Sequence, residues 1–248
     1  MNIKRLFRKK QKDPHCSVVV VAAGSSERMG ADKMLMTLGA KPVIIRTLMA
    51  FQKSPMVDDI VVVTRPEKIM GLADMIKLYD INKVTQVISG GATRMESALA
   101  GVSAVRKGAK LIAIHDGARP LVTQDLIERV VNAANEHMAA VPAVRCVDTL
   151  KQIDGNGVIT GGVDRDSVVR VQTPQVFDAD IIKGALTKAV EKHLPLTDDC
   201  SAMDMMGVKT HTVEGDAGNI KLTEPMDMVL AEAILKSRGE RYAHRTRL

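Results

Sequence analysis

The chain has 248 residues, enough for one large α/β domain or two small ones. A chain of this length buries a sizeable core, so it needs neither disulfides nor a structural zinc to fold. Its three cysteines, Cys16, Cys146 and Cys200, form no CxxC pair and fit a reducing compartment. Only 2% of the residues are aromatic and none is tryptophan, which argues against a stacking platform for single-stranded nucleic acid.

The net charge of +6 comes from the two ends of the chain. Residues 1–12 carry six Lys or Arg and no acid, and residues 236–248 carry five basic residues and one acid. The 24 basic and 28 acidic residues between them leave this part at −4. We therefore expect a basic, flexible tail at 1–14, a second basic tail at 237–248, and no nucleic-acid partner.

The basic start and the apolar run at 18–23 together resemble a secretory signal peptide. The run is at the short limit for such a peptide and has the length of an ordinary buried strand. Nowhere does the sequence approach the roughly eighteen consecutive apolar residues of a membrane span. We expect a cytoplasmic location and no membrane partner.

From residue 17 onward, short β-branched segments alternate with amphipathic segments of helical length. The expected strands are 17–23, 58–64, 83–89, 110–116 and 139–145. The expected helices are 42–54 (with Pro42 as its first residue), 66–79, 93–105, 123–137, 179–192 and one from Glu224. This order predicts an α/β fold over 15–236, with a single doubly wound, mostly parallel, Rossmann-like sheet.

Residues 146–170 interrupt this alternation. The sequence DGNG at 154–157 is typical of a hairpin turn, and short alternating segments flank it. We expect a protruding β-hairpin arm. An isolated two-stranded hairpin is only marginally stable in water, so the arm should pack against something, such as a second subunit.

The first strand runs into AAGSSERMGADK, residues 22–33. Gly24 permits a tight turn, a small-residue loop can present backbone N–H groups to an anion, and Arg28 and Lys33 add positive charge. The phosphate-loop pattern GxxxxGK[ST] and the dinucleotide pattern GxGxxG are both missing. The alternatives are a plain turn with two surface cations or a loop that handles phosphate, and we favour the second.

The third expected strand leads into SGGATRMES, residues 89–97. Gly90 and Gly91 permit close backbone approach, and Arg94 supplies charge. Thr93 and Glu96 have the spacing of a capping box, which predicts a helix start at the same place. A helix start is itself a site for anions, so both interpretations can hold.

The fourth expected strand ends in AIHDGARP, residues 113–120. Asp116 could ligate Mg²⁺ that accompanies a polyphosphate, or could simply be a turn residue. His115 has neither metal-ligand partners nor a nucleophile beside it, so we expect a structural role. Three such strand ends at one edge of a sheet predict a nucleoside triphosphate site.

The motifs occur in an order that resembles the 2-C-methyl-D-erythritol 4-phosphate cytidylyltransferases, over roughly residues 17–236. They are AAGSSERMGADK, GGATRMESALAG, HDGARP, VDTLK, VDRDSVVRVQTPQVF, TDDCSAM and VEGDAGNIKLTEP. The first motif alone would equally suit molybdenum-cofactor nucleotidyltransferases, and the later ones narrow the resemblance. It implies transfer of CMP from CTP to methylerythritol phosphate, with release of pyrophosphate, in the non-mevalonate isoprenoid pathway.

The resemblance also implies roles for individual residues. Arg28 and Lys33 would be catalytic, stabilising charge on the α-phosphate. Mg²⁺ or another divalent cation would be the cofactor, with Asp116 beside it directly or through water, and CTP would be the co-substrate. The residues expected to bind CTP are Ala22, Ala23, Gly24, Ser25, Ser26, Gly91, Ser97, Asp116 and Lys221. Those expected to bind methylerythritol phosphate are Thr149, Arg165, Thr173, Thr197 and Lys221. The family exchanges its arm between two subunits, which implies a homodimer.

Some positions depart from the family pattern, and other functions stay open. Ser26 and Ala92 stand where the family commonly has a glycine and an acid. A sister enzyme acting on ribitol 5-phosphate or another polyol phosphate is one alternative. A non-catalytic nucleotide-binding protein is another, although the presence of Arg28, Lys33 and Lys221 favours an enzyme. A dehydrogenase is a third alternative, but the dinucleotide-binding motif of that class is missing from this sequence.

Overall fold

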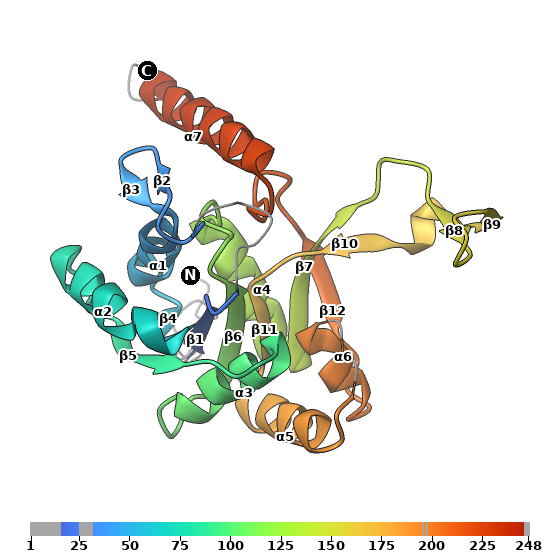
Figure 1. Ribbon diagram of the computed structural model, residues 1–248, viewed down its shortest axis with the longest axis horizontal. Helices are drawn as coiled ribbons and strands as arrows, with labels where there is room; N and C mark the ends of the chain where they lie inside the picture. The colour runs from blue at the N-terminus through green and yellow to red at the C-terminus, as the bar shows by residue number, and fades with distance from the viewer. Residues whose placement is uncertain (1–15, 25–31, 195, 197, 246–248) are drawn as a thin grey trace, which may run out of the picture.

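The computed structural model describes residues 16–24, 32–194, 196 and 198–245. Figure 1 shows a central sheet with helices on both faces and an arm that projects from one side. The strands of the sheet follow the order β10-β7-β11-β6-β1-β4-β5, with β12 paired to β7. The doubly wound α/β fold expected from the sequence is confirmed.

Five strands of this sheet match the expected ones to within a few residues. They are β1 (Cys16–Val21), β4 (Val57–Thr64), β5 (Val84–Ser89), β6 (Leu111–Asp116) and β7 (Ala139–Arg145). β1 pairs in parallel with β4 and β6, and β4 with β5. The remaining strands of the sheet are β10 (Val169–Val171), β11 (Gln175–Asp178) and β12 (His211–Glu214). β11 runs antiparallel between β6 and β7, β10 runs antiparallel to β7, and β12 runs parallel to β7.

The helices also lie close to their expected places. They are α1 (Val43–Lys53), α2 (Ile69–Leu78), preceded by the 3₁₀ turn η3 (Pro66–Lys68), α3 (Arg94–Ala104), α4 (Gln124–His137), α5 (Ala179–Glu191) and α7 (Pro225–Arg245). The short helix α6 (Asp199–Asp204) was not predicted from the sequence. Pro42 caps α1 instead of opening it, because it pairs with Thr37 in the small hairpin β2 (Thr37–Leu38) and β3 (Lys41–Pro42). α7 continues past residue 236. No helix in the described parts is both long and apolar enough to cross a bilayer.

Alternate residues of β1 face the two sides of the sheet, as strand geometry requires. Val18 and Val20 pack in a core with α1, α2 and α4, and Val19 packs in a second core with α3, α5 and α6. α3 lies very close to the sheet: a side chain at Gly101 would come within 2.2 Å of Val19 Cγ1. The same position lies 2.8 Å from Val63 Cγ2, so α3 packs directly on β1 and β4.

The arm contains the expected hairpin, formed by β8 (Lys151–Ile153) and β9 (Ile159–Gly162). Asp154 Oδ1 accepts hydrogen bonds from the backbone N–H groups of Asn156 and Val158, both at 2.9 Å. Gly157 has a φ of +81°, which suits glycine in this turn. The arm carries exposed apolar side chains, namely Val147, Ile153, Val158 and Ile159.

Candidate active site

The carboxylate of Asp116, at the carboxyl end of β6, is the centre of the site. It is buried, and three cations surround it: Lys221 Nζ at 2.9 Å, Arg94 Nε at 3.5 Å and Arg119 Nε at 3.6 Å. Burial alone would raise the pKa of Asp116, but Lys221 and Arg94 outweigh it and hold the pKa well below its usual range. Asp116 is therefore a carboxylate at every physiological pH.

Arg94 connects this carboxylate to α6. Its two terminal nitrogens donate to the two oxygens of the buried Asp199, at 3.0 and 2.8 Å. Burial would lower the pKa of Arg94, but Asp199 and Asp116 raise it above its usual value. This two-point ion pair joins the first residue of α3 to the first residue of α6.

His115 precedes Asp116 on β6 and is fully buried. Its Nε2 lies 3.2 Å from the carbonyl oxygen of Arg119, which can only accept, so Nε2 carries the proton. Nδ1 then accepts from the Thr173 hydroxyl at 3.1 Å, and that hydroxyl oxygen accepts from the backbone N–H of Asp116 at 3.1 Å. Burial lowers the pKa of His115 to about 4, which keeps the ring neutral. These contacts agree with the structural role expected for His115.

The segment before α7 brings Lys221 to Asp116. Asn219 is fully buried, and its Nδ2 donates to the carbonyl oxygen of Thr173 at 2.9 Å. The Asn219 carbonyl oxygen accepts from Arg119 at 2.7 Å, and Leu222 N–H donates to the Ala118 carbonyl at 2.9 Å. These hydrogen bonds hold residues 219–222 against the loop after β6, on both sides of Lys221.

The glycine pair after β5 closes the same edge of the sheet. A Cβ at Gly90 would lie 2.6 Å from Ser97 Oγ and 2.9 Å from Ala23 Cβ, so only glycine fits there. The buried Ser97 hydroxyl donates to the Thr93 carbonyl at 2.9 Å and accepts from Gly91 N–H at 3.2 Å. The predicted capping box of Thr93 and Glu96 is present at the start of α3. Gly90 therefore lies between Ala23, at the end of β1, and Ser97, in the first turn of α3.

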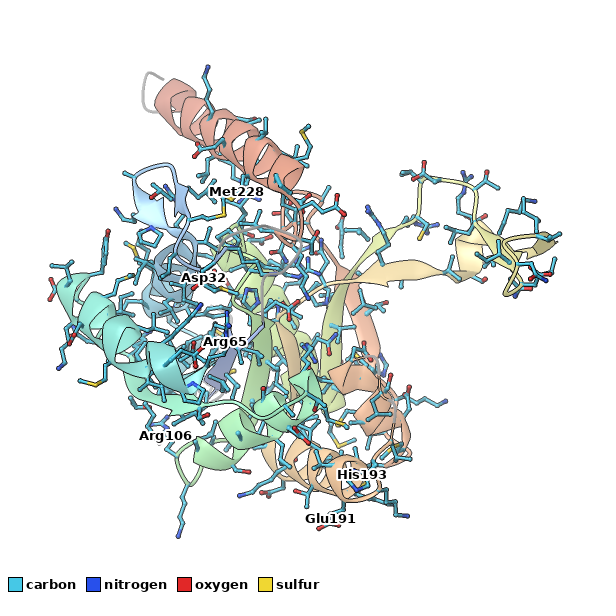
Figure 2. All side chains as sticks on the ribbon, in the orientation of Figure 1. Asp32, Arg65, Arg106, Glu191, His193 and Met228 are labelled. Carbon is cyan, nitrogen blue, oxygen red and sulfur yellow. The ribbon has the colours of Figure 1, made fainter. Side chains whose placement is uncertain are left out.

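Lys33 lies near Asp227, in the first turn of α7. Burial would raise the pKa of Asp227, but hydrogen bonds from Thr223 and Glu224 and the charge of Lys33 lower it. The half-buried Lys33 is thus close enough to this carboxylate to affect its charge state. Figure 2 labels Asp32, the residue before Lys33, and Arg65, which follows β4, and both lie toward this end of the sheet.

The expected site residues divide into three groups. Those near the carboxyl edge of the sheet are Ala22, Ala23, Gly24, Lys33, Gly91, Ser97, Asp116, Thr173 and Lys221. Thr149 and Arg165 are exposed on the arm, which projects away from that edge (Figure 1). Ser25, Ser26, Arg28 and Thr197, together with the tail at 1–14, lie outside the described residues.

Sequence reasoning did not assign roles to Arg119, Asp199 or Asn219. Arg119 donates a hydrogen bond to the carbonyl oxygen of Asn219, and Asp199 is the main ion-pair partner of Arg94. A second acid in TDD and an asparagine two residues before Lys221 are the only signals in the sequence. Within the described residues, no group of three or more His, Cys, Asp or Glu has the geometry of a metal site.

Comparisons with known proteins agree on one family. The family model described as "IspD: 2-C-methyl-D-erythritol 4-phosphate cytidylyltransferase" matches residues 16–237. A protein of that name from Symbiobacterium thermophilum is 39% identical over 89% of this chain and 92% of its own length. Another, from Dehalococcoides mccartyi, is 40% identical over 88% of this chain and 95% of its own.

Solved structures give the same result. The 4-diphosphocytidyl-2C-methyl-D-erythritol synthase of Anaerococcus prevotii has a TM-score of 0.81 at 28% identity, covering 90% of this chain and 99% of that one. The 2-C-methyl-D-erythritol 4-phosphate cytidylyltransferase of Thermus thermophilus has a TM-score of 0.73 at 31% identity, covering 89% and 98%. This chain belongs to the IspD family of 2-C-methyl-D-erythritol 4-phosphate cytidylyltransferases.

Proposed function

We propose that this cytidylyltransferase transfers CMP from CTP to 2-C-methyl-D-erythritol 4-phosphate at the edge of the sheet around Asp116. The products are pyrophosphate and 4-diphosphocytidyl-2-C-methyl-D-erythritol, an isoprenoid precursor. The observation that carries the proposal is the convergence of Lys221, Arg94 and Arg119 on one strand-end carboxylate. Such a cluster beside a glycine-lined loop suits a triphosphate and its leaving group.

The proposed nucleotide pocket lies between the end of β1 at Ala23 and the start of α3 at Ser97. Glycine at position 90 lets Ala23 and Ser97 pack close to the backbone of this loop, which brings the end of β1 near the start of α3, where we place the base. Ser97 holds the backbone of Gly91 in place, and Ala22 and Ala23 add small side chains at the end of β1. We place the triphosphate between Lys221 and the segment AAGSSERMGADK, which includes Gly24, Ser25 and Ser26.

The chemistry needs charge stabilisation more than proton transfer. The acceptor is a phosphate that is already ionised near neutral pH, so no strong general base is required to form the bond to the α-phosphorus. As the bond to pyrophosphate breaks, negative charge grows on the α-phosphoryl oxygens and the leaving group. We assign Lys33 and Arg28 to the first charge and Lys221 to the second.

The charges around Asp116 decide how Mg²⁺ would bind. Asp116 and Asp199 provide two negative charges, whereas Arg94, Arg119 and Lys221 provide three positive ones. A divalent cation alone would meet a net positive cluster with one available carboxylate. Carboxylate and phosphate oxygens together are ligands that Mg²⁺ prefers. The residues therefore fit Mg²⁺ that arrives with CTP, held by Asp116 directly or through water, where it would neutralise charge on the leaving pyrophosphate.

The arm is proposed to bind the acceptor of a partner subunit in a homodimer with exchanged arms. Thr149 and Arg165 are exposed on an arm that projects from its own subunit (Figure 1), and apolar side chains on the same arm are also exposed. Thr173 and Thr197 would contact the acceptor from the body of the subunit. Three unbonded cysteines support a cytoplasmic location.

Pyrophosphate release from CTP and Mg²⁺ tests this function. The assay is run with methylerythritol phosphate, with ribitol 5-phosphate and without an acceptor. Release with the first acceptor alone is the expected result. Release only with ribitol 5-phosphate would assign the chain to the sister reaction. Binding of CTP without pyrophosphate release under any of the three conditions would contradict an enzymatic function.

A further inference from the structure

The catalytic lysine proposed above lies between two anchored residues. On one side, Met34 is buried in the core, and its carbonyl oxygen accepts from Ile44 N–H at 3.0 Å at the start of α1. On the other side lies Asp32, whose carbonyl oxygen accepts from Leu35 N–H at 3.0 Å. The backbone position of Lys33 thus depends on both neighbours.

Asp32 is held by a residue from another part of the chain. Its Oδ2 forms an ion pair with the ammonium group of Lys68, the last residue of η3. Its Oδ1 accepts from Met34 N–H at 3.2 Å, which closes the turn around Lys33. The side chains are only 19% and 26% exposed, so water and salt screen the pair less than a surface pair. Asp32 is labelled in Figure 2, close to α1.

We infer that Lys68 is a positioning residue for Lys33, acting through Asp32. The inference rests on the proposed function, because it assumes that Lys33 acts on the α-phosphate. A cation that stabilises a transition state must be in place before charge develops, and a displacement of about 1 Å can cost about 100-fold in rate. Met34 anchors one side of Lys33 through the core, and the Asp32–Lys68 pair anchors the other.

The rival explanation is that Lys68 binds the triphosphate itself. Its charge is already matched by Asp32, so a direct role would require the pair to open when CTP binds. The two roles predict different kinetics. A positioning residue acts on kcat and only while Lys33 is present, whereas a direct contact acts on CTP binding whether or not Lys33 is present.

The first test compares Lys68→Met and Asp32→Asn, since asparagine can still accept from Met34 N–H. Each variant should lower kcat by about 10-fold to about 100-fold, with the KM for CTP changed less than about threefold. Lys68→Arg should keep most of the activity, because arginine can also pair with Asp32. Lys77→Met, at an exposed position of α2, is the matched control and should behave as wild type.

Two double variants separate the roles. The double variant Asp32→Asn/Lys68→Met should be as active as the less active of the two single variants, because both changes break the same interaction. In a Lys33→Ala background, Lys68→Met should have no further effect. A further loss in that background, or a raised KM with unchanged kcat, would overturn the inference in favour of direct binding.

Hydrogen exchange tests the inference without turnover. The Leu35 amide, bonded to the Asp32 carbonyl, should exchange faster in Lys68→Met than in wild type or in Lys77→Met. Unchanged exchange would overturn the inference even if the enzyme is active. Failure of the wild-type enzyme to release pyrophosphate would instead contradict the proposed function, and the exchange result would still decide whether Lys68 holds this turn.

Discussion

The ammonium group of Lys221 lies 2.9 Å from the carboxylate of Asp116 and joins the segment before α7 to the end of β6. Asn219, two residues earlier, is buried and bonded to the Thr173 backbone, which holds the backbone of this segment at the edge of the sheet. In the proposed function, an incoming triphosphate would meet a preplaced cation. Preplaced charge is effective in catalysis because it needs no reorganisation during the reaction.

The Arg94–Asp199 pair should be a large contributor to stability. Arg94→Gln leaves the fully buried Asp199 without its cation, so it should lower the free energy of unfolding by about 3–5 kcal/mol. Arg94→Gln/Asp199→Asn should regain part of this loss, because no buried charge is left unpaired. Urea denaturation at neutral pH measures both.

The control for this comparison is Arg129→Gln. Arg129 pairs with the exposed Asp125 on α4, and removing such a pair should cost about 1 kcal/mol or less. Equal losses in Arg94→Gln and Arg129→Gln would show that the buried pair has no special weight.

His115 should stay neutral well below the pH at which histidine usually protonates. Its pKa in the folded protein is about 4, against about 6.5 in an unfolded chain. The unfolded state binds a proton first as the pH falls. The neutral His115 therefore makes its full contribution to the free energy of unfolding above about pH 6.5. That contribution falls by about 3 kcal/mol as the pH drops from 6.5 to 4.

Nitrogen NMR of the imidazole checks this directly. At pH 6 and at pH 5, the spectrum should show a proton on Nε2 and none on Nδ1, as the contacts with Arg119 and Thr173 require. A doubly protonated ring at pH 5, or a proton on Nδ1, would contradict the hydrogen-bond assignment.

Much of the fold could be predicted because short stretches of neighbouring residues determine its strands, turns and helix starts. Buried parallel strands are apolar on both faces, which made β1, β4 and β6 visible as β-branched runs. The turn at 154–157 and the capping box of Thr93 depend on neighbouring residues alone. These features need no knowledge of distant contacts.

What could not be predicted depends on segments far apart in the chain. No local pattern indicates that β11 inserts antiparallel between β6 and β7, since its direction is set by the pairing. The Arg94–Asp199 pair and the bond from Asn219 to Thr173 exist only after helices and loops have packed. The strand-end cations were visible in the sequence, but the acid that holds Arg94 was not.

Divalent metal should bind to this protein together with CTP and only weakly without it. The three cations around Asp116 repel a free divalent ion, and the triphosphate reverses that balance. Titration of Mn²⁺ followed by electron paramagnetic resonance, with and without CTP and in the absence of acceptor, measures the difference. Tight binding of Mn²⁺ to the protein alone would contradict this account of the charges.

Exchange of the arms predicts recovery of activity when two inactive variants are mixed. Lys33→Ala should block the reaction at its own edge, and Arg165→Ala should weaken acceptor binding at the partner's edge. A mixed dimer then has one complete site. Random mixing of equal amounts should recover about a quarter of the wild-type activity. No recovery, with mixed dimers shown by mass spectrometry, would contradict the exchanged arm.

In the proposed mechanism, this edge of the sheet accelerates cytidylyl transfer by stabilising charge on the α-phosphate. The variant Lys33→Ala tests this, with kcat measured by pyrophosphate release and CTP affinity measured separately by calorimetry. We expect kcat to fall by about 100-fold or more, while the Kd for CTP changes less than about threefold. A weaker Kd with unchanged kcat would contradict it, because Lys33 would then bind the nucleotide equally in the ground and transition states.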